Sequence, residues 1–121
     1  LMMMLDEDWL ELFWNAAKGN LEERQLLWKE GAACCVTMSG KDYPLRSSKG
    51  IEIDALPEDD ESSKVFFAGV KRQGGQLLTN GGRVLSVCHL SKDLENAING
   101  CYQSVSKVKC KDLDYRKDIG R

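Results

Sequence analysis

An arginine directly follows two glycines and directly precedes a run of strand-forming residues in the stretch LTNGGRVLSV, residues 78–87. Glycines leave their backbone N–H groups unshielded and tolerate conformations that other residues avoid. A guanidinium beside them can clamp a phosphate or a carboxylate through two parallel hydrogen bonds. Gly81, Gly82 and Arg83 are therefore a candidate anion-binding site, and a tight turn beside a surface arginine is the alternative that the same residues allow.

A second charged stretch lies near the end of the chain, where Arg116 and Asp118 precede an isoleucine and a glycine in YRKDIG. Asp118 can pair locally with Arg116 or with a distant arginine such as Arg83. A local pair on the surface contributes less than ~1 kcal/mol to stability. The residues alone leave both pairings open.

The sequence gives little support for nucleophilic catalysis or for a metal site. Cys88 and His89 are the only Cys/His neighbours, and adjacent strand residues project to opposite faces. No nucleophile elbow, phosphate-binding loop or dinucleotide-binding glycine pattern is present. The five cysteines contain no C-x-x-C pair, and a single histidine leaves too few zinc ligands. We predict no catalytic residue and no metal site in this chain, and reduced thiols typical of a cytosolic protein.

Composition sets further bounds. A chain of 121 residues is one domain or part of one, and 42% apolar with 30% charged residues is ordinary for a globular protein. The net charge of −2 gives no field that favours nucleic acid. The apolar start, LMMML, is far shorter than the ~20 residues of a membrane span. Because the chain starts with leucine in what resembles a cut element, we expect a fragment of something longer.

The first third predicts one helix and one strand. Apolar residues recur at helical spacing from Asp6 to Lys18, and Lys18-Gly19 is a helix-ending signal. Its aromatic face predicts core packing, with a binding platform as the alternative. Residues 21–30 fit either a helix or a strand. Ala32 to Met38 is a continuous apolar run, which predicts a strand buried on both faces.

The remainder alternates short strands with turns. Strands are predicted over Val65 to Val70 and Val84 to Cys88, with a loop over Lys71 to Gly75 and a strong turn signal at Asn80-Gly81. The acidic run PEDDESS, residues 57–63, predicts a solvated loop. Ser91 is expected to cap a helix whose inward face holds Leu94, Ala97, Ile98, Cys101, Val105 and Val108. This order indicates an α+β fold with antiparallel strands.

Four stretches together carry a resemblance: VFFAGV, GGQLLTNGGRVLSV, DLENAINGCYQSV and YRKDIG. They resemble the carboxyl-terminal domain of the phosphoribosylamine–glycine ligases, also called glycinamide ribonucleotide synthetases. Upstream, DEDWLELFWNAAKGNL resembles the helix that leaves the ATP-grasp domain of that family. AACCVTMSGKDYPLRSSKGIEI resembles the strand and Tyr-Pro loop that follow, although two glycines of the family loop are absent here.

The resemblance implies a particular fold. It is a small antiparallel, barrel-like hybrid-motif domain with an N-terminal helix and one helix packed on the sheet. Residues 1–30 would be the end of the ATP-grasp region, with residues 24–30 extended or irregular. Residues 31–121 would be the carboxyl-terminal synthetase domain.

The resemblance also implies a function. Members join glycine to 5-phosphoribosylamine in de novo purine synthesis, with ATP and Mg²⁺ bound mainly outside this domain. The chain alone would then be inactive, in a cytoplasmic protein whose upstream ATP-grasp and phosphoribosylamine-binding domains are its partners. Tyr43, Gly81, Gly82, Arg83 and Asp118 would face substrate or the domain junction. A non-catalytic interaction module that kept the fold, or the equivalent domain of another ATP-grasp enzyme such as a carboxylase, are the alternatives.

Overall fold

Two long antiparallel strands, β1 (Ala32–Gly40) and β6 (Arg83–Ser91), form the middle of the computed structural model, which describes residues 1–121. β3 (Ser63–Phe67) pairs with the free edge of β6, and β7 (Leu113–Tyr115) pairs with that of β1. The resulting sheet has the order β3-β6-β1-β7. Its inner strands carry the β-branched residues that suit a pleated, half-buried surface.

A smaller sheet joins β2 (Ser48–Glu52), β4 (Val70–Gln73) and β5 (Gln76–Gly81) in the order β2-β5-β4. The loop predicted from Lys71 to Gly75 is wrong, because β4 continues through Gln73. Only Gly74 and Gly75 turn, with φ of +58° and +85°, the left-handed backbone that a two-residue hairpin requires.

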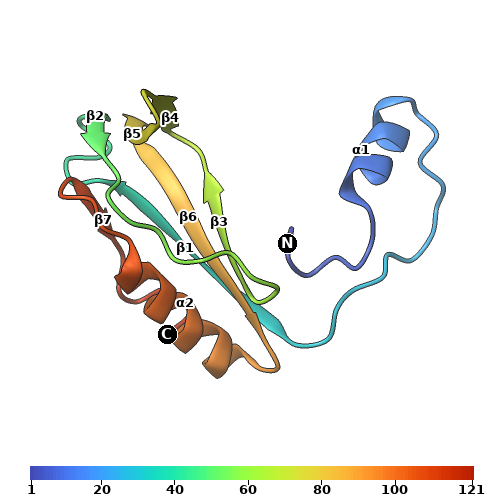
Figure 1. Ribbon diagram of the computed structural model, residues 1–121. Helices are drawn as coiled ribbons and strands as arrows, with labels where there is room; N and C mark the ends of the chain where they lie inside the picture. Colours follow the sequence, from blue (N-terminus) through green and yellow to red (C-terminus); the bar gives the residue numbers. More distant parts are fainter.

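α2 (Leu94–Lys107) covers one face of the larger sheet (Figure 1). The predicted cap at Ser91 is wrong: the carboxylate of Asp93 caps the helix and accepts a hydrogen bond from the backbone N–H of Asn96 at 2.8 Å. The predicted inward face is otherwise confirmed. Leu94, the first residue of the helix, is the exception at 54% exposed. The core lies between this helix and the sheet and includes Val36, Met38, Leu85, Val87, Ala97, Ile98, Cys101, Val105 and Val108.

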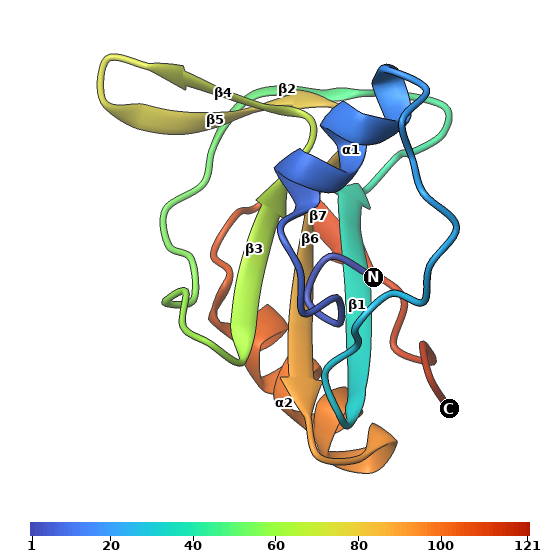
Figure 2. The same cartoon turned by 90° about the vertical axis from the view of Figure 1, so that its right-hand side faces the viewer.

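α1 (Trp9–Ala17) is the predicted N-terminal helix. Lys18 followed by Gly19 at φ +72° ends it, as predicted, whereas its start lies at Trp9, capped by Asp8, and not at the predicted Asp6. It stands on the opposite side of the larger sheet from α2 (Figure 2). The predicted core packing of its aromatic face is wrong for this chain, because none of its residues is buried and Phe13 and Trp14 are 55% and 59% exposed.

The segment between α1 and β1 is irregular, which the family resemblance implied and helix propensity did not. Trp28 forms an isolated antiparallel bridge with Leu5. The backbone N–H of Lys29 donates to the carbonyl of Met4 at 2.8 Å. These bonds tie the start of the chain to residues just before β1.

β1 is buried on one face only, so the predicted burial on both faces is wrong. Cys34 is buried towards α2, whereas its neighbour Cys35 is exposed on the other face. No second helix packs closely on that face, and we call it the open face. Neither helix has the length and apolar character that crossing a membrane requires.

Candidate functional site

The chain passes from one sheet to the other at a corner where Gly69 and Gly81 touch. The backbone N–H of Gly69 donates to the carbonyl of Arg83 at 3.0 Å, and Asn80 N–H donates to the carbonyl of Gly69 at 2.7 Å. A Cβ on Gly69 would lie 2.7 Å from that Arg83 oxygen and 2.8 Å from the Cα of Gly81. Only glycine allows so close a crossing. The strand predicted over Val65 to Val70 is therefore split here into the ends of β3 and β4.

The turn signal at Asn80-Gly81 marks this corner. The chain leaves β5 and enters β6 there, yet the two strands lie in different sheets. Arg83 is the first residue of β6, so its position is fixed by the corner on one side and by pairing with Ser39 of β1 on the other. The register of β1 and β6 shifts between Met38 and Ser39. Such irregularities re-aim a side chain at the end of a ladder.

An open cleft of about 600 Å³ lies beside the corner. Arg83 supplies its only charged side chain. The rest of its lining is hydroxyl groups, backbone and small residues: Thr37, Tyr43, Pro44, Ser47, Ala68, Gly69, Gly82 and Ser86. The hydroxyls of Thr37 and Ser86 lie 3.0 Å apart on the neighbouring strands β1 and β6.

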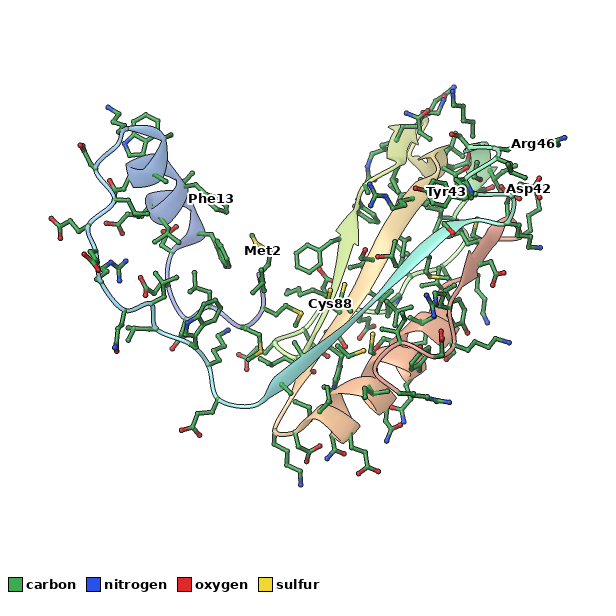
Figure 3. The ribbon with its side chains drawn as sticks, turned by 180° about the vertical axis from the view of Figure 1, so that it is seen from behind. Met2, Phe13, Asp42, Tyr43, Arg46 and Cys88 are labelled. Carbon is green, nitrogen blue, oxygen red and sulfur yellow. The ribbon has the colours of Figure 1, made fainter.

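Tyr43 reaches the cleft from the loop between β1 and β2. The backbone N–H of Tyr43 donates to the carbonyl of Gly40 at 3.0 Å, and Gly40 N–H donates to the carbonyl of Gly82 at 2.9 Å. This turn sets the tyrosine ring against Gly82, where a Cβ would lie 2.6 Å from Cε2 of the ring. Figure 3 shows Tyr43 on this loop at the end of the sheet, beside Asp42 and Arg46.

The charge of Arg83 is uncompensated. Each of the four ion pairs of the chain joins other residues, and no carboxylate lines the cleft. A lone guanidinium among hydroxyl groups and glycine backbone offers donors to an anion and no negatively charged ligand to a cation. The chain also contains no cluster of three or more His, Cys, Asp or Glu residues that could hold a metal ion.

Asp118 does not meet Arg83. It pairs with Arg116 instead, whose Nε and Nη2 donate to its two carboxylate oxygens at 2.9 and 2.6 Å. This pairing lowers the pKa of Asp118 and raises that of Arg116. Tyr102 of α2 holds the same segment, because its hydroxyl donates to the Arg116 carbonyl and accepts from the Ile119 N–H, each at 2.9 Å. Of the predicted site residues, Tyr43, Gly82 and Arg83 thus line one cleft, Gly81 forms the corner behind it, and Asp118 lies elsewhere.

Sequence reasoning missed Thr37 and Ser86. They become neighbours only through the pairing of β1 with β6, in which Thr37 faces Ser86. No local sequence pattern in either strand predicts that contact. Pro44 and Ser47 could have been found from the sequence, because Pro44 belongs to the Tyr-Pro loop that the resemblance indicated and Ser47 follows it closely.

The acidic run before β3 serves structure. Asp60 accepts hydrogen bonds from the hydroxyl of Ser62 at 2.8 Å and from the backbone N–H groups of Ser62 and Ser63 at 2.7 and 2.6 Å. These bonds lower the pKa of Asp60, that from the Ser62 hydroxyl contributing most. The run is a solvated turn leading into β3, as predicted.

Comparisons with known proteins agree on one family. The family described as phosphoribosylglycinamide synthetase, C domain, matches residues 33–121. Phosphoribosylamine–glycine ligase of Fusobacterium nucleatum is 37% identical over 99% of this chain and 29% of its own length. The enzyme of that name from Rhizobium meliloti is 40% identical over 99% of this chain and 28% of its own length.

A solved structure agrees with these sequences. The crystal structure of phosphoribosylamine–glycine ligase from Thermotoga maritima matches 91% of this chain and 27% of its own, with a TM-score of 0.70 and 32% identity. The chain therefore spans less than a third of the length of the relatives it matches. Its α+β fold, with two helices and two antiparallel sheets, is the fold of that neighbour.

Proposed function

The chain belongs to the phosphoribosylglycinamide synthetase C-domain family, and on that premise we propose that it is the carboxyl-terminal domain of a phosphoribosylamine–glycine ligase. Such an enzyme joins glycine to 5-phosphoribosylamine at the expense of ATP, in purine biosynthesis. One observation carries the proposal: relatives with this name align with nearly the whole chain, from the N-terminal helix to the last strand. In the parent protein, residues 1–30 would end the ATP-grasp region and residues 31–121 would form this domain.

We propose that Arg83 binds an anionic group of a substrate in the cleft. Both substrates carry such a group, the phosphate of phosphoribosylamine and the carboxylate of glycine. A guanidinium holds either through paired charge-assisted hydrogen bonds, and the hydroxyls of Thr37 and Ser86 add neutral donors beside it. The Tyr43 ring would wall the cleft and orient the ligand. No residue of this chain is offered as a proton donor or nucleophile.

Mg²⁺ does not fit this cleft. Mg²⁺ takes carboxylate and phosphate oxygens, and the cleft lining holds no carboxylate. We therefore derive no step through Mg²⁺ here. We propose that ATP and Mg²⁺ are bound by the upstream ATP-grasp domain, with a phosphoribosylamine-binding domain as the second intramolecular partner. All five cysteines are free thiols, which suits a reducing compartment, so we propose a cytoplasmic enzyme.

The test is an assay of the chain together with the sequence that precedes it in its reading frame. We expect ADP formation that requires both glycine and phosphoribosylamine, and none from residues 1–121 alone. A preceding region without an ATP-grasp domain would favour the non-catalytic interaction module. Activity that depends on a different acceptor would assign the domain to another ATP-grasp enzyme.

A further inference from the structure

Two cysteines from strands far apart in sequence face each other on the open face of the larger sheet. Cys35 of β1 is the direct antiparallel partner of Cys88 of β6. Residues so paired have Cα atoms ~4.5–5.5 Å apart. A disulfide spans Cα separations of ~4.4–6.8 Å. The backbone of the folded chain therefore already holds these two residues at a distance that a bond between them needs.

Cys35 of this pair is open to reagents from solution, whereas Cys88 is buried at 9% exposed. Cys35 is exposed, and together with Cys88 it lines a hollow of about 420 Å³ on the open face. The rest of the lining is almost wholly apolar and includes Met2 and Phe66. Met2 and Cys88 lie on the same side of the sheet, between it and α1 (Figure 3). A thiol in such a hollow is reachable and partly shielded from bulk water.

The two thiols differ in acidity. Hydrogen bonding from Cys88, with a smaller contribution from Ser86, lowers the pKa of Cys35 to about 6. The same hydrogen bond, followed by burial, raises the pKa of Cys88. Cys35 is thus the thiolate at neutral pH, and Cys88 is the protonated donor that stabilises it. A nucleophile beside a second, resolving thiol is the arrangement found in redox-sensitive cysteine pairs.

The neighbouring cysteines do not share these properties. Cys34 points to the opposite face and is buried, and Cys101 of α2 is fully enclosed. Burial is the main cause that raises the pKa of Cys101 to about 12. Buried thiols of this kind behave as small apolar residues and react slowly. Cys88 is also buried, but it lies on the open face as the direct strand partner of exposed Cys35, so the proposed pair is confined to that face.

We propose that Cys35 and Cys88 form a redox-sensitive modification site that is oxidised by low-molecular-weight disulfides such as glutathione disulfide. The Cys35 thiolate attacks one sulfur of the reagent, forming a mixed disulfide and releasing one glutathione thiolate. Cys88 then gives its proton to water or to that thiolate and attacks the Cys35 sulfur. The second glutathione leaves, and a Cys35–Cys88 disulfide remains. Two protein thiols are oxidised and one glutathione disulfide is reduced to two glutathiones.

The site adjoins the cleft that holds Arg83. Ser86 lines both hollows, and its hydroxyl meets that of Thr37 in the cross-strand row next to Cys35 and Cys88. Residues two apart on a strand are ~6.6 Å apart. A glutathionyl group on Cys35 therefore sits at the border of the cleft. The inference rests on the thiols alone and stands whether or not the chain serves a ligase.

The experiment treats residues 1–121 with glutathione disulfide and follows intact mass and tryptic peptides. We expect a final product lighter by two hydrogens, with peptide 30–41 joined to peptide 84–92. A reducing agent should restore the starting mass. Unmodified Cys35 after exhaustive treatment, or glutathione that stays on Cys35 while Cys88 is intact, would overturn the proposal.

Three variants show which cysteine sulfurs form the disulfide. Cys88→Ser should stop at a stable mixed disulfide with one glutathione on Cys35. Cys35→Ser changes an exposed side chain and should abolish the peptide cross-link. Cys34→Ala is the matched control, since Cys34 lies in the same peptide but points to the other face, and it should form the cross-link as the wild type does. A cross-link that survives in Cys35→Ser would assign the bond to Cys34 and refute the pair. Because the wild-type peptide result needs no variant, the proposal stays testable even if one of them fails to fold.

Discussion

Gly82 lies directly against the aromatic ring of Tyr43, and no side chain fits between them. A Cβ at position 82 would be 2.6 Å from Cε2 of that ring and closer still to Cδ2. The backbone of Gly82 also accepts the N–H of Gly40, which starts the turn that carries Tyr43. The glycine before Arg83 is thus needed for the wall of the cleft as well as for the path of the chain.

Gly82→Ala should displace the Tyr43 ring and destabilise the fold by about 1–3 kcal/mol, the usual cost of forcing an extra carbon into a packed contact. Urea denaturation of both variants and of Tyr43→Ala would measure it. With the ring removed, the added methyl has room, so Gly82→Ala should cost markedly less in the Tyr43→Ala background. Equal costs in both backgrounds would mean that the ring is not the obstacle.

Arg83→Ala in the proposed parent ligase should raise KM for the substrate whose anion Arg83 is proposed to bind. Losing a hydrogen-bonded charge partner costs about 1.5–3 kcal/mol, or roughly 10- to 150-fold. Separate titrations of glycine and phosphoribosylamine would show which group is bound, and Arg83→Lys should recover part of the loss. Arg72→Ala on β4 is the matched control, because that exposed arginine lies outside the cleft. If Arg83→Ala leaves both KM values unchanged in a folded enzyme, Arg83 does not bind substrate.

Gly100→Ala should destabilise the protein although alanine is the better helix former. In an exposed helix this substitution gains up to ~1 kcal/mol. Here a Cβ at Gly100 of α2 would lie 2.8 Å from Cε1 of His89 and closer to two other ring atoms. We expect a net loss of about 1–2 kcal/mol by thermal or urea denaturation. In a His89→Ala background, Gly100→Ala should instead increase the free energy of unfolding. If Gly100→Ala alone stabilises the protein, the imidazole of His89 moves away freely.

Alkylation of Cys35 by iodoacetamide should follow the lowered pKa of its thiol. The thiolate persists above pH about 6 and is lost as the pH falls through that value. The titratable and charged groups that act on it are Cys88 and the amino group of Leu1, and Lys64, which pairs with Asp59, lies beyond Cys88 on β3. The Cys35 rate should thus stay nearly level down to neutral pH and halve near pH 6.

The control is the chain unfolded in urea, where an ordinary thiol pKa of ~8.5 predicts a tenfold fall per pH unit below about pH 8. The folded chain should react faster than the unfolded one at pH 6, although the lower basicity of its thiolate offsets part of the gain. Identical pH profiles in the two states would show that the fold does not activate Cys35.

Local signals predicted both helices, because helical spacing and end signals act within a few residues, although the cap of α2 is Asp93 and not the predicted Ser91. Asp8, Lys18 and Gly19 end α1 as their types imply, and the inward face of α2 follows its apolar spacing. The opposite orientations of Cys34 and Cys35 follow from strand geometry alone. Arg83 was identified as an anion-binding candidate because its neighbours in the chain are glycines.

What the sequence left unpredicted depends on partners distant along the chain. Apolar residues predicted that both faces of β1 and the aromatic face of α1 are buried. Apolar character indicates that a surface is suited to contact, but it does not show that this chain contains the element that would cover it. The signal at Asn80-Gly81 is that of a hairpin, and only the pairing of β5 with β2 and β4 makes it a passage between sheets. Asp118 pairs with Arg116 and not with Arg83, and a local pair costs less chain entropy than a distant one.

The crossing at Gly69 and Gly81 forms the base of the β4–β5 hairpin. The hairpin projects from the body of the molecule (Figure 2), and short bends at Ala68-Gly69 and at Gly82 connect its strands to β3 and β6 of the larger sheet. Backbone hydrogen bonds hold this corner together, including the one that the Gly69 N–H donates to the Arg83 carbonyl. The base of the hairpin and the first residue of β6, Arg83, therefore share one backbone anchor.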